Sequence, residues 1–271
     1  MVAVVTITTV LFVAIWFLLR PFAGTQSLPK PQPTPTIVPP IRIVITGDSI
    51  SHGREGDYTW RYRLWEWLQE QEVQAEFLGP SIGTYGRIVK DDGEDGEDGN
   101  TLRDLGELPP EAGYALDVDP EFVRSGSAHY THWGKAAWEL VPQAQDLVET
   151  YQPDYLLVEL GFNDMGWGVY DARDLLASMK QIVDRARAAK PNIKMAIANV
   201  PHRRTPGPRD TVYEQTQEYN GMLRSAIAQW TQPDSPIALV KFNEVYTCMF
   251  TFFLSNGYLL FLFFFGLSNA L

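Results

Sequence analysis

Apolar and polar positions along the chain follow two different periods. Short apolar runs, typical of buried strands, lie at about 41–46, 75–78, 155–160, 193–200 and 236–240. Between these runs, apolar residues recur every three to four positions, which predicts helices at about 59–71, 134–151, 172–189 and 211–230. Strands that alternate with helices predict an α/β fold with a doubly wound parallel sheet, whose site lies at the carboxyl ends of the strands.

Both ends of the chain depart from this pattern. Residues 1–19 carry no charged side chain and are about long enough to span a bilayer, so we expect a signal anchor or a signal peptide within 1–22. A proline-rich linker is expected at 23–40, because such a run prefers an extended polyproline conformation. The expected organisation is a secreted or membrane-anchored domain at 41–247, on the extracellular side, and an apolar tail of uncertain status at 248–271.

Composition narrows the classes of function. The formal net charge is −11 and the pI is about 4.8, so we expect no nucleic-acid partner. A single cysteine, Cys248, excludes an intrachain disulfide, and the four histidines show no metal-ligand spacing, so no metal is expected. The acidic run at 91–99 matches neither an EF-hand loop nor a calcium-binding repeat, which favours a solvated loop over a calcium site.

The first chemical signal is Gly47-Asp48-Ser49, which ends the first predicted strand just before a helical pattern. A serine at a sharp strand-to-helix turn is where α/β hydrolases place a nucleophile, because the turn exposes Oγ and aims backbone N–H groups at a developing oxyanion. The alternative interpretation is a serine that only caps a helix.

The second signal is Gly161-x-Asn163-Asp164, at the end of the third predicted strand. An asparagine there can direct its amide to the same oxyanion, so Ser49 and Asn163 are expected to converge. Together the two motifs resemble the SGNH, or GDSL, hydrolase family. The resemblance implies a three-layer, flavodoxin-like sheet with strand order 2-1-3-4-5.

The resemblance also implies roles for individual residues. Ser49 would attack an ester carbonyl, and the N–H groups of Ser49 and Gly134 with the Asn163 amide would form the oxyanion hole. Gly134 is chosen because the segment 127–135 resembles the family's second block, and because it opens the predicted helix at 134–151, whose dipole favours negative charge. Gly79 and Gly83, after the second strand, are the competing choices.

Four further motif residues are expected to support the site, and three to contact substrate. Asp48 would orient the turn and Asp164 would support Asn163, while Gly47 and Gly161 would form their motifs' turns. The tryptophans near these motifs can stack on sugars or hold acyl chains, although core packing is the default for tryptophan. The candidate substrate contacts are Trp133, Trp167 and His202.

The substrate class implied by the resemblance is an acylated carbohydrate or another small ester. Within the family, the pattern at 62–68 is most similar to carbohydrate esterases that deacetylate xylan. No metal or organic cofactor is implied. Residues 1–19 would provide the membrane contact.

The family pattern fails at the carboxyl end. The resemblance implies a late Asp-x-x-His block that supplies the base, yet no aspartate or histidine follows Asp234 and no charge lies within 245–271. Little turnover is therefore expected, unless His52 or His202 replaces the base. Two alternatives stay open: a non-catalytic relative that binds acylated glycan or lipid, and a shifted reading frame after Cys248.

Overall fold

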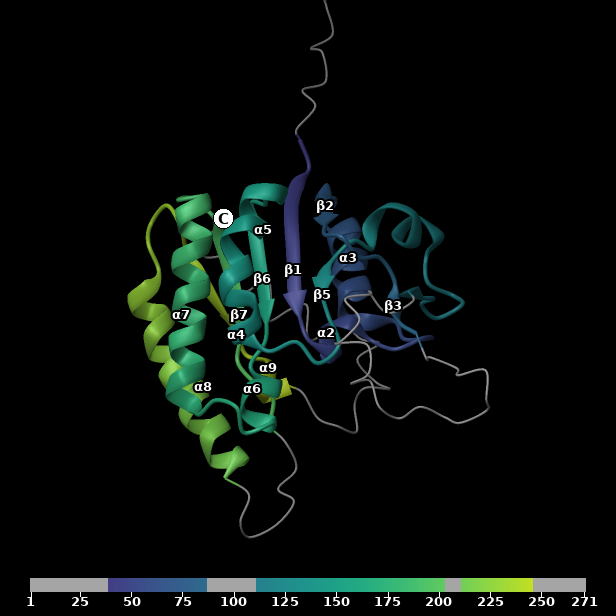
Figure 1. Cartoon of the computed structure of the whole chain (residues 1–271). Helices are drawn as coiled ribbons and strands as arrows, with labels where there is room; N and C mark the ends of the chain where they lie inside the picture. Colours follow the sequence, from purple (N-terminus) through teal and green to yellow (C-terminus); the bar gives the residue numbers. More distant parts are fainter. Residues whose placement is uncertain (1–38, 87–110, 203–210, 246–271) are drawn as a thin grey trace, which may run out of the picture. The chain divides into compact units, whose positions relative to one another are not determined.

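Five parallel strands form the centre of the domain, and a sixth short strand pairs with the first of these along the chain (Figure 1). The computed structural model describes residues 39–86, 111–202 and 211–245. The main strands lie in the order β2 (Ala75–Leu78), β1 (Ile41–Gly47), β6 (Tyr155–Glu159), β7 (Lys194–Ala198) and β8 (Ile237–Val240). Counted along the five main strands, this is the predicted order 2-1-3-4-5, so the α/β fold class is confirmed.

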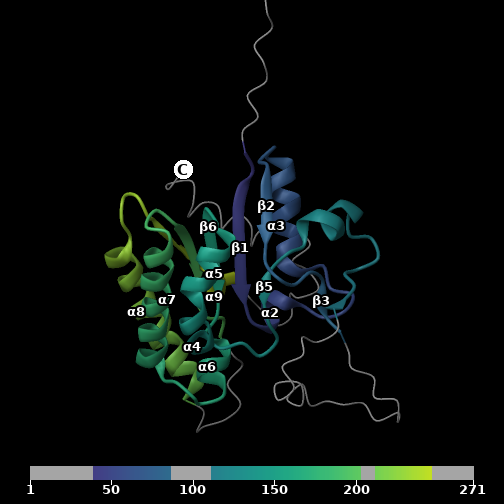
Figure 2. The same cartoon turned by 45° about the horizontal axis from the view of Figure 1, so that its top comes forward.

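Helices cover both faces of the sheet, which gives three layers (Figures 1 and 2). Val44, Leu156 and Ile197 point to one face, where they pack in a core formed with the helices α4 (Ala137–Leu140), α5 (Ala144–Tyr151), α7 (Ala172–Ala189) and α8 (Val212–Trp230). Ile43, Ile45 and Leu157 alternate with them and pack in the opposite core, which contains α3 (Thr59–Glu70). This alternation is the period-2 pattern of a strand buried on both sides.

One predicted helix is not continuous in the structure. The segment 134–151 contains α4, a 3-10 turn at Val141–Gln143 and α5, instead of a single helix beginning at Gly134. Pro142 lies in the 3-10 turn, and a proline inside a helix removes a backbone donor and clashes with the preceding turn. Pro142 therefore explains the interruption, which the spacing of apolar residues alone does not predict.

Several short elements were not predicted. They are α2 (Ser49–His52), β3 (Thr84–Tyr85), β4 (Glu111–Ala112), a π-helical turn (Phe122–Gly126), β5 (Tyr130–Thr131), α6 (Phe162–Gly166) and α9 (Phe242–Val245). The most consequential is β5, which continues beside β1 beyond the end of β2, with Thr46 opposite Tyr130 and Gly47 opposite Thr131. This pairing brings the segment that follows β5 to the carboxyl end of β1.

Other expectations lie outside the described residues. These are the signal anchor or signal peptide at 1–22, nearly all of the linker at 23–40, the acidic run at 91–99 and the tail at 248–271. Within the described ranges, no helix has both the length and the apolar character needed to cross a membrane.

Candidate active site

The turn after β1 is built around the nucleophile predicted from the sequence. Asp48 caps α2, because its Oδ1 accepts the Ile50 N–H at 2.9 Å. Ser49 is the first residue of α2 and is half-buried. Position 47 requires glycine, since a Cβ there would lie 2.4 Å from Ser51 Oγ. The motif therefore folds the start of α2 back tightly onto the end of β1 (Figure 1).

Asn163 connects the three motif segments. It lies in α6, directly after β6, and its Nδ2 donates to the Lys135 carbonyl at 2.9 Å and to Asp48 Oδ2 at 3.4 Å. Gly161 precedes it with a positive φ of 116°, and a Cβ at that position would lie 2.8 Å from side-chain carbons of Leu175 and Val200. The asparagine amide thus lies beside the residue that precedes Ser49.

Gly134 lies in the loop that β5 brings to this site. The His132 N–H donates to the Gly47 carbonyl at 3.0 Å, and Gly134 has φ of 73°, in the region that favours glycine. The expectation that Gly134 opens a helix is wrong, because α4 begins at Ala137. Asp164 accepts the backbone N–H groups at the start of α4, at 2.8 Å from Ala137, so it occupies that helix end itself.

The two competing glycines have other contacts. A Cβ on Gly79 would lie 2.0 Å from the His129 carbonyl oxygen, so Gly79 permits a close approach of two backbones. The Gly83 carbonyl accepts hydrogen bonds from Arg61, Tyr114 and His129. The loop of Gly134 differs in that the carbonyl of the next residue, Lys135, accepts a hydrogen bond from Asn163.

Three histidines lie close to the turn. The ring of His52 is 5.2 Å from that of His129 and 6.5 Å from that of His132, measured between centroids. Burial, with smaller effects from Arg61 and His132, lowers the pKa of His52 to about 3, so this imidazole is neutral at pH 7. Within the described parts of the chain, no histidine forms a hydrogen bond with the Ser49 hydroxyl.

His202 lies at the same edge of the sheet as Ser49, after β7. Its Nδ1 is 3.3 Å from Asn243 Oδ1, and Asn243 belongs to α9, which follows β8. Asn199, after β7, accepts the Asn243 N–H and donates to Glu244. The contacts of His202 in the structure are therefore with the β8 end and not with the Ser49 turn.

Arg61 is a structural residue of the site that sequence reasoning missed. It is fully buried in α3 and donates to the carbonyls of Ser51, His52, Gly83 and Ser127 and to the Tyr114 hydroxyl. A buried cation is tolerated only when its donors are satisfied, and Arg61 uses them to hold α2 against two loops. An arginine among the apolar positions of the 59–71 pattern was the available signal.

Glu159 is the second residue that was missed. It ends β6, is 4 % exposed, and its Oε2 accepts a 2.7 Å hydrogen bond from Ser51 Oγ. An acidic residue inside the apolar run at 155–160 was the signal for it, because such residues are rarely buried without a specific partner.

The two candidate tryptophans lie in different environments. Trp133 is half-buried and stacks on Tyr85, with ring centroids 4.7 Å apart, and the Arg54 guanidinium lies 5.1 Å from its ring. Trp167 follows α6 and is 47 % exposed. Both lie in segments that adjoin the site, so both are available to line its rim.

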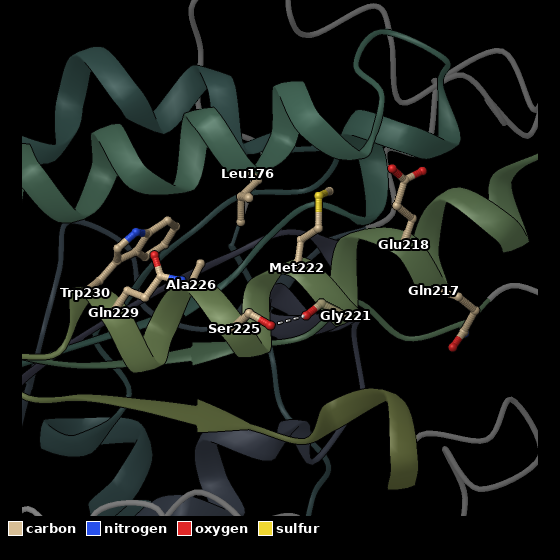
Figure 3. A pocket seen from close by; sticks show the side chains of 9 residues that line it. All are labelled: Leu176, Gln217, Glu218, Gly221, Met222, Ser225, Ala226, Gln229 and Trp230. Carbon is tan, nitrogen blue, oxygen red and sulfur yellow. Dashed lines mark hydrogen bonds between the residues drawn. The ribbon is translucent and has the colours of Figure 1, made fainter.

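The described residues contain no metal-binding cluster, and their open groove lies apart from this site. In the described ranges, no group of three or more His, Cys, Asp or Glu side chains is arranged to hold a metal ion. An open groove lies between α7 and α8 (Figure 3), lined by Leu176, Gln217, Glu218, Gly221, Met222, Ser225, Ala226, Gln229 and Trp230. It contains none of the predicted site residues.

Comparisons with known proteins bear on the family and the fold. Residues 116–244 match the model of the GDSL-like Lipase/Acylhydrolase family, which confirms the family resemblance found in the sequence. A search of curated proteins gives no significant match.

Solved structures support the fold. A family 3 carbohydrate esterase from Talaromyces cellulolyticus is 18% identical, with a TM-score of 0.52, and the alignment covers 74% of this chain and 78% of that one. The family 3 carbohydrate esterase of Clostridium thermocellum is 18% identical, with a TM-score of 0.51 and coverage of 77% and 81%. TesA is 16% identical, with a TM-score of 0.52 and coverage of 85% and 99%.

Proposed function

We propose that this chain, which matches the GDSL-like lipase/acylhydrolase family over residues 116–244, carries the site of an SGNH-type serine ester hydrolase. The observation that carries the proposal is the pair of hydrogen bonds from Asn163 Nδ2 to Lys135 and Asp48. They tie the turn of Ser49, the loop of Gly134 and the third motif to one point at the strand ends.

In the proposed reaction, Ser49 Oγ attacks the ester carbonyl. The carbonyl oxygen becomes an oxyanion, which the N–H groups of Ser49 and Gly134 and the Asn163 amide stabilise. The acyl group passes to Ser49, the alcohol leaves with a proton, and water then releases the acid. Each half-reaction needs a base to accept a proton, first from Ser49 and then from water.

We propose an acylated carbohydrate or another small ester as the substrate. The support comes from the aromatic side chains beside the site, since Trp133 with Tyr85 and the exposed Trp167 offer surfaces on which sugar rings stack. Two of the structural neighbours are described as carbohydrate esterases. We further propose that the domain is extracellular and attached to a membrane through residues 1–19.

A second function is favoured by one specific observation. The 31 residues from Lys241 onward hold no aspartate or histidine, so the base expected from the family pattern is missing from this sequence. A chain of this composition would bind an acylated glycan or lipid in the same site and hydrolyse it slowly. The two proposed functions differ only in the rate of hydrolysis, since both use the same site residues.

Labelling of the serine tests the proposed site. The full-length chain is incubated with a fluorophosphonate, which phosphonylates activated serines, and the adduct is mapped by mass spectrometry. Because the base of the family pattern is missing from this sequence, we expect a slowly formed adduct at Ser49. No adduct should form in Ser49→Ala, and labelling should slow by a further factor of about 10² in Asn163→Ala, which removes one oxyanion donor. Ser125→Ala, an exposed serine bonded to Glu121, is the matched control and should label normally. An adduct at another serine would refute the proposed nucleophile.

A further inference from the structure

Glu159 occupies a position where an ionised side chain is unfavourable. It is the last residue of β6, it lies opposite Gly47 of β1, and it is 4 % exposed. No lysine, arginine or histidine in the described ranges lies within ion-pair distance of it. An isolated buried carboxylate is expensive, so the side chain must be neutral or strongly hydrogen-bonded.

Glu159 contacts α2, the short helix that begins at Ser49. Ser51 Oγ donates to its Oε2 at 2.7 Å, and Trp60 Nε1 donates to the same Ser51 Oγ at 3.0 Å. Glu159 lies opposite Gly47, the residue before Asp48, and, besides burial, the Asp48 carboxyl group is among the causes that raise the pKa of Glu159. Because Asp48 is also a carboxyl group, a hydrogen bond between the two side chains requires one shared proton.

The other partners of Asp48 indicate which group keeps that proton. Asp48 accepts from the Ile50 N–H and from the Asn163 amide, and both of these donors favour an ionised acceptor. Burial and the neighbouring Asp48 raise the pKa of Glu159 well above its usual range. Arg61, the buried cation of α3, binds the Ser51 and His52 carbonyls.

We propose that Glu159 is a positioning residue that stays protonated at neutral pH, donates its proton to Asp48, and thereby holds Asp48 where it caps α2 and orients the Asn163 amide. Glu159 itself touches no substrate. Its effect on chemistry passes through Asp48 to the oxyanion donor, and in that respect the inference rests on the proposed function. The proton sharing itself is independent of any reaction.

Two substitutions separate this role from mere packing. Glu159→Gln keeps a neutral side chain with one donor and one acceptor, so it imitates the protonated acid. Glu159→Ala removes both. If the proton is shared as proposed, the glutamine variant behaves like the native chain and the alanine variant does not. If Glu159 were ionised, glutamine would remove a charge and disturb Ser51 and Asp48.

The first measurement is infrared spectroscopy of the full-length chain at pH 7. We expect a carbonyl band of a protonated carboxylic acid that disappears in Glu159→Gln. Asp164→Asn serves as the control, because Asp164 is another buried carboxyl group and its substitution should leave the Glu159 band in place. Absence of any band lost in Glu159→Gln would overturn the proposal.

The second measurement follows Asn163 directly. In the full-length chain labelled with ¹⁵N-asparagine, the side-chain resonance of Asn163 is identified by its loss in Asn163→Ala. We expect that resonance to keep its position in Glu159→Gln and to shift in Glu159→Ala. An unchanged resonance in a folded Glu159→Ala protein would overturn the positioning role. If Glu159→Ala does not fold, Glu159→Gln must still keep the native resonance, and a shift there would equally overturn the role.

The third measurement links the role to reactivity. Phosphonylation of Ser49 should slow by about tenfold or more in Glu159→Ala and change less than about threefold in Glu159→Gln. Equal slowing in both variants would contradict the proposal. If the native chain is not labelled at all, the proposed hydrolase site fails, while the infrared band and the Asn163 resonance still decide the role of Glu159.

Discussion

The carboxyl ends of β1 and β8 lie at the same edge of the sheet and are built very differently. At the β1 end, the hydrogen bond between Asn163 and Asp48 joins segments more than one hundred residues apart. The buried Glu159 and Arg61 bind the side chain and the carbonyl of the nearby Ser51. At the β8 end, Asn199 holds the start of α9 through amide and carboxylate hydrogen bonds. The first end carries Ser49, the nucleophile of the proposed hydrolase.

This difference separates two requirements of a serine hydrolase. The nucleophile and oxyanion donors depend on tight turns and satisfied buried hydrogen bonds, and the β1 end has both. The base depends on an imidazole that reaches the serine, whereas the imidazole near the β8 end, His202, is paired with Asn243. Within the described residues, buried hydrogen bonds hold Asn163 to Asp48 and Lys135, and no histidine is hydrogen-bonded to the Ser49 hydroxyl, so variants at the two ends should behave independently.

The largest effect on stability is expected at Arg61. Arg61→Met should cost about 3–5 kcal/mol, because it removes the guanidinium donor from the carbonyls of Ser51, His52 and Ser127 and one of the three donors to the Gly83 carbonyl. Chemical denaturation measures the loss. Arg173→Met is the control, since Arg173 is 82% exposed and should change stability by less than about 0.5 kcal/mol. Similar results for the two variants would show that the β1 end does not depend on its buried cation.

Gly47→Ala should have the next largest effect and lower the free energy of unfolding by about 2–4 kcal/mol. The new methyl group would overlap Ser51 Oγ and Cβ, at 2.4 and 2.6 Å, and neither can move without disturbing Glu159. Gly221→Ala is the matched control in α8, where a Cβ meets nothing within 4 Å, and it should gain up to about 1 kcal/mol. A neutral Gly47→Ala protein would mean that α2 is not packed as described.

Acidic pH should weaken the β1 end through its histidines. An unfolded histidine titrates near pH 6.5, but burial lowers the pKa of His52 to about 3, so only the unfolded state binds a proton between these values. Stability should therefore fall as pH falls through this window, by up to about 1.4 kcal/mol per pH unit for His52. Burial lowers the pKa of His129 in the same direction.

His52→Phe isolates that contribution. Equilibrium unfolding at several pH values between 6.5 and 3 should give a shallower slope in this variant than in the native chain. An identical slope would show that His52 does not stay neutral in the folded state at these pH values.

The smallest effect is expected at the β8 end. Asn199→Ala should cost about 1–2 kcal/mol, because it leaves the Asn243 N–H without its acceptor and removes the amide donor from Glu244, which keeps Arg224. Combined with Gly47→Ala, its cost should add within about 0.5 kcal/mol, because the two sites share no hydrogen-bond partner. A larger interaction energy in this double-mutant cycle would show that the two strand ends are coupled.

The sequence predicted the elements whose pattern is local. The five main strands, the helices α3, α7 and α8, and the strand ends that carry Ser49 and Asn163 follow from apolar periodicity and two motifs. The two-residue β5 has no periodicity to detect, yet its pairing with β1 brings Gly134 to the site. Arg61 and Glu159 stood out only as charged residues at apolar positions, and their partners come from distant segments that the sequence could not specify.

The most direct test is the rate at which the full-length chain hydrolyses short acyl esters, measured against Ser49→Ala. Loss of triad members in serine hydrolases lowers the rate by about 10⁴–10⁶, and only oxyanion and binding contributions remain. We therefore predict that the native chain is at most about tenfold faster than Ser49→Ala. Turnover many thousandfold above that variant would contradict the account, and would require that His52, His202 or another group serves as the base.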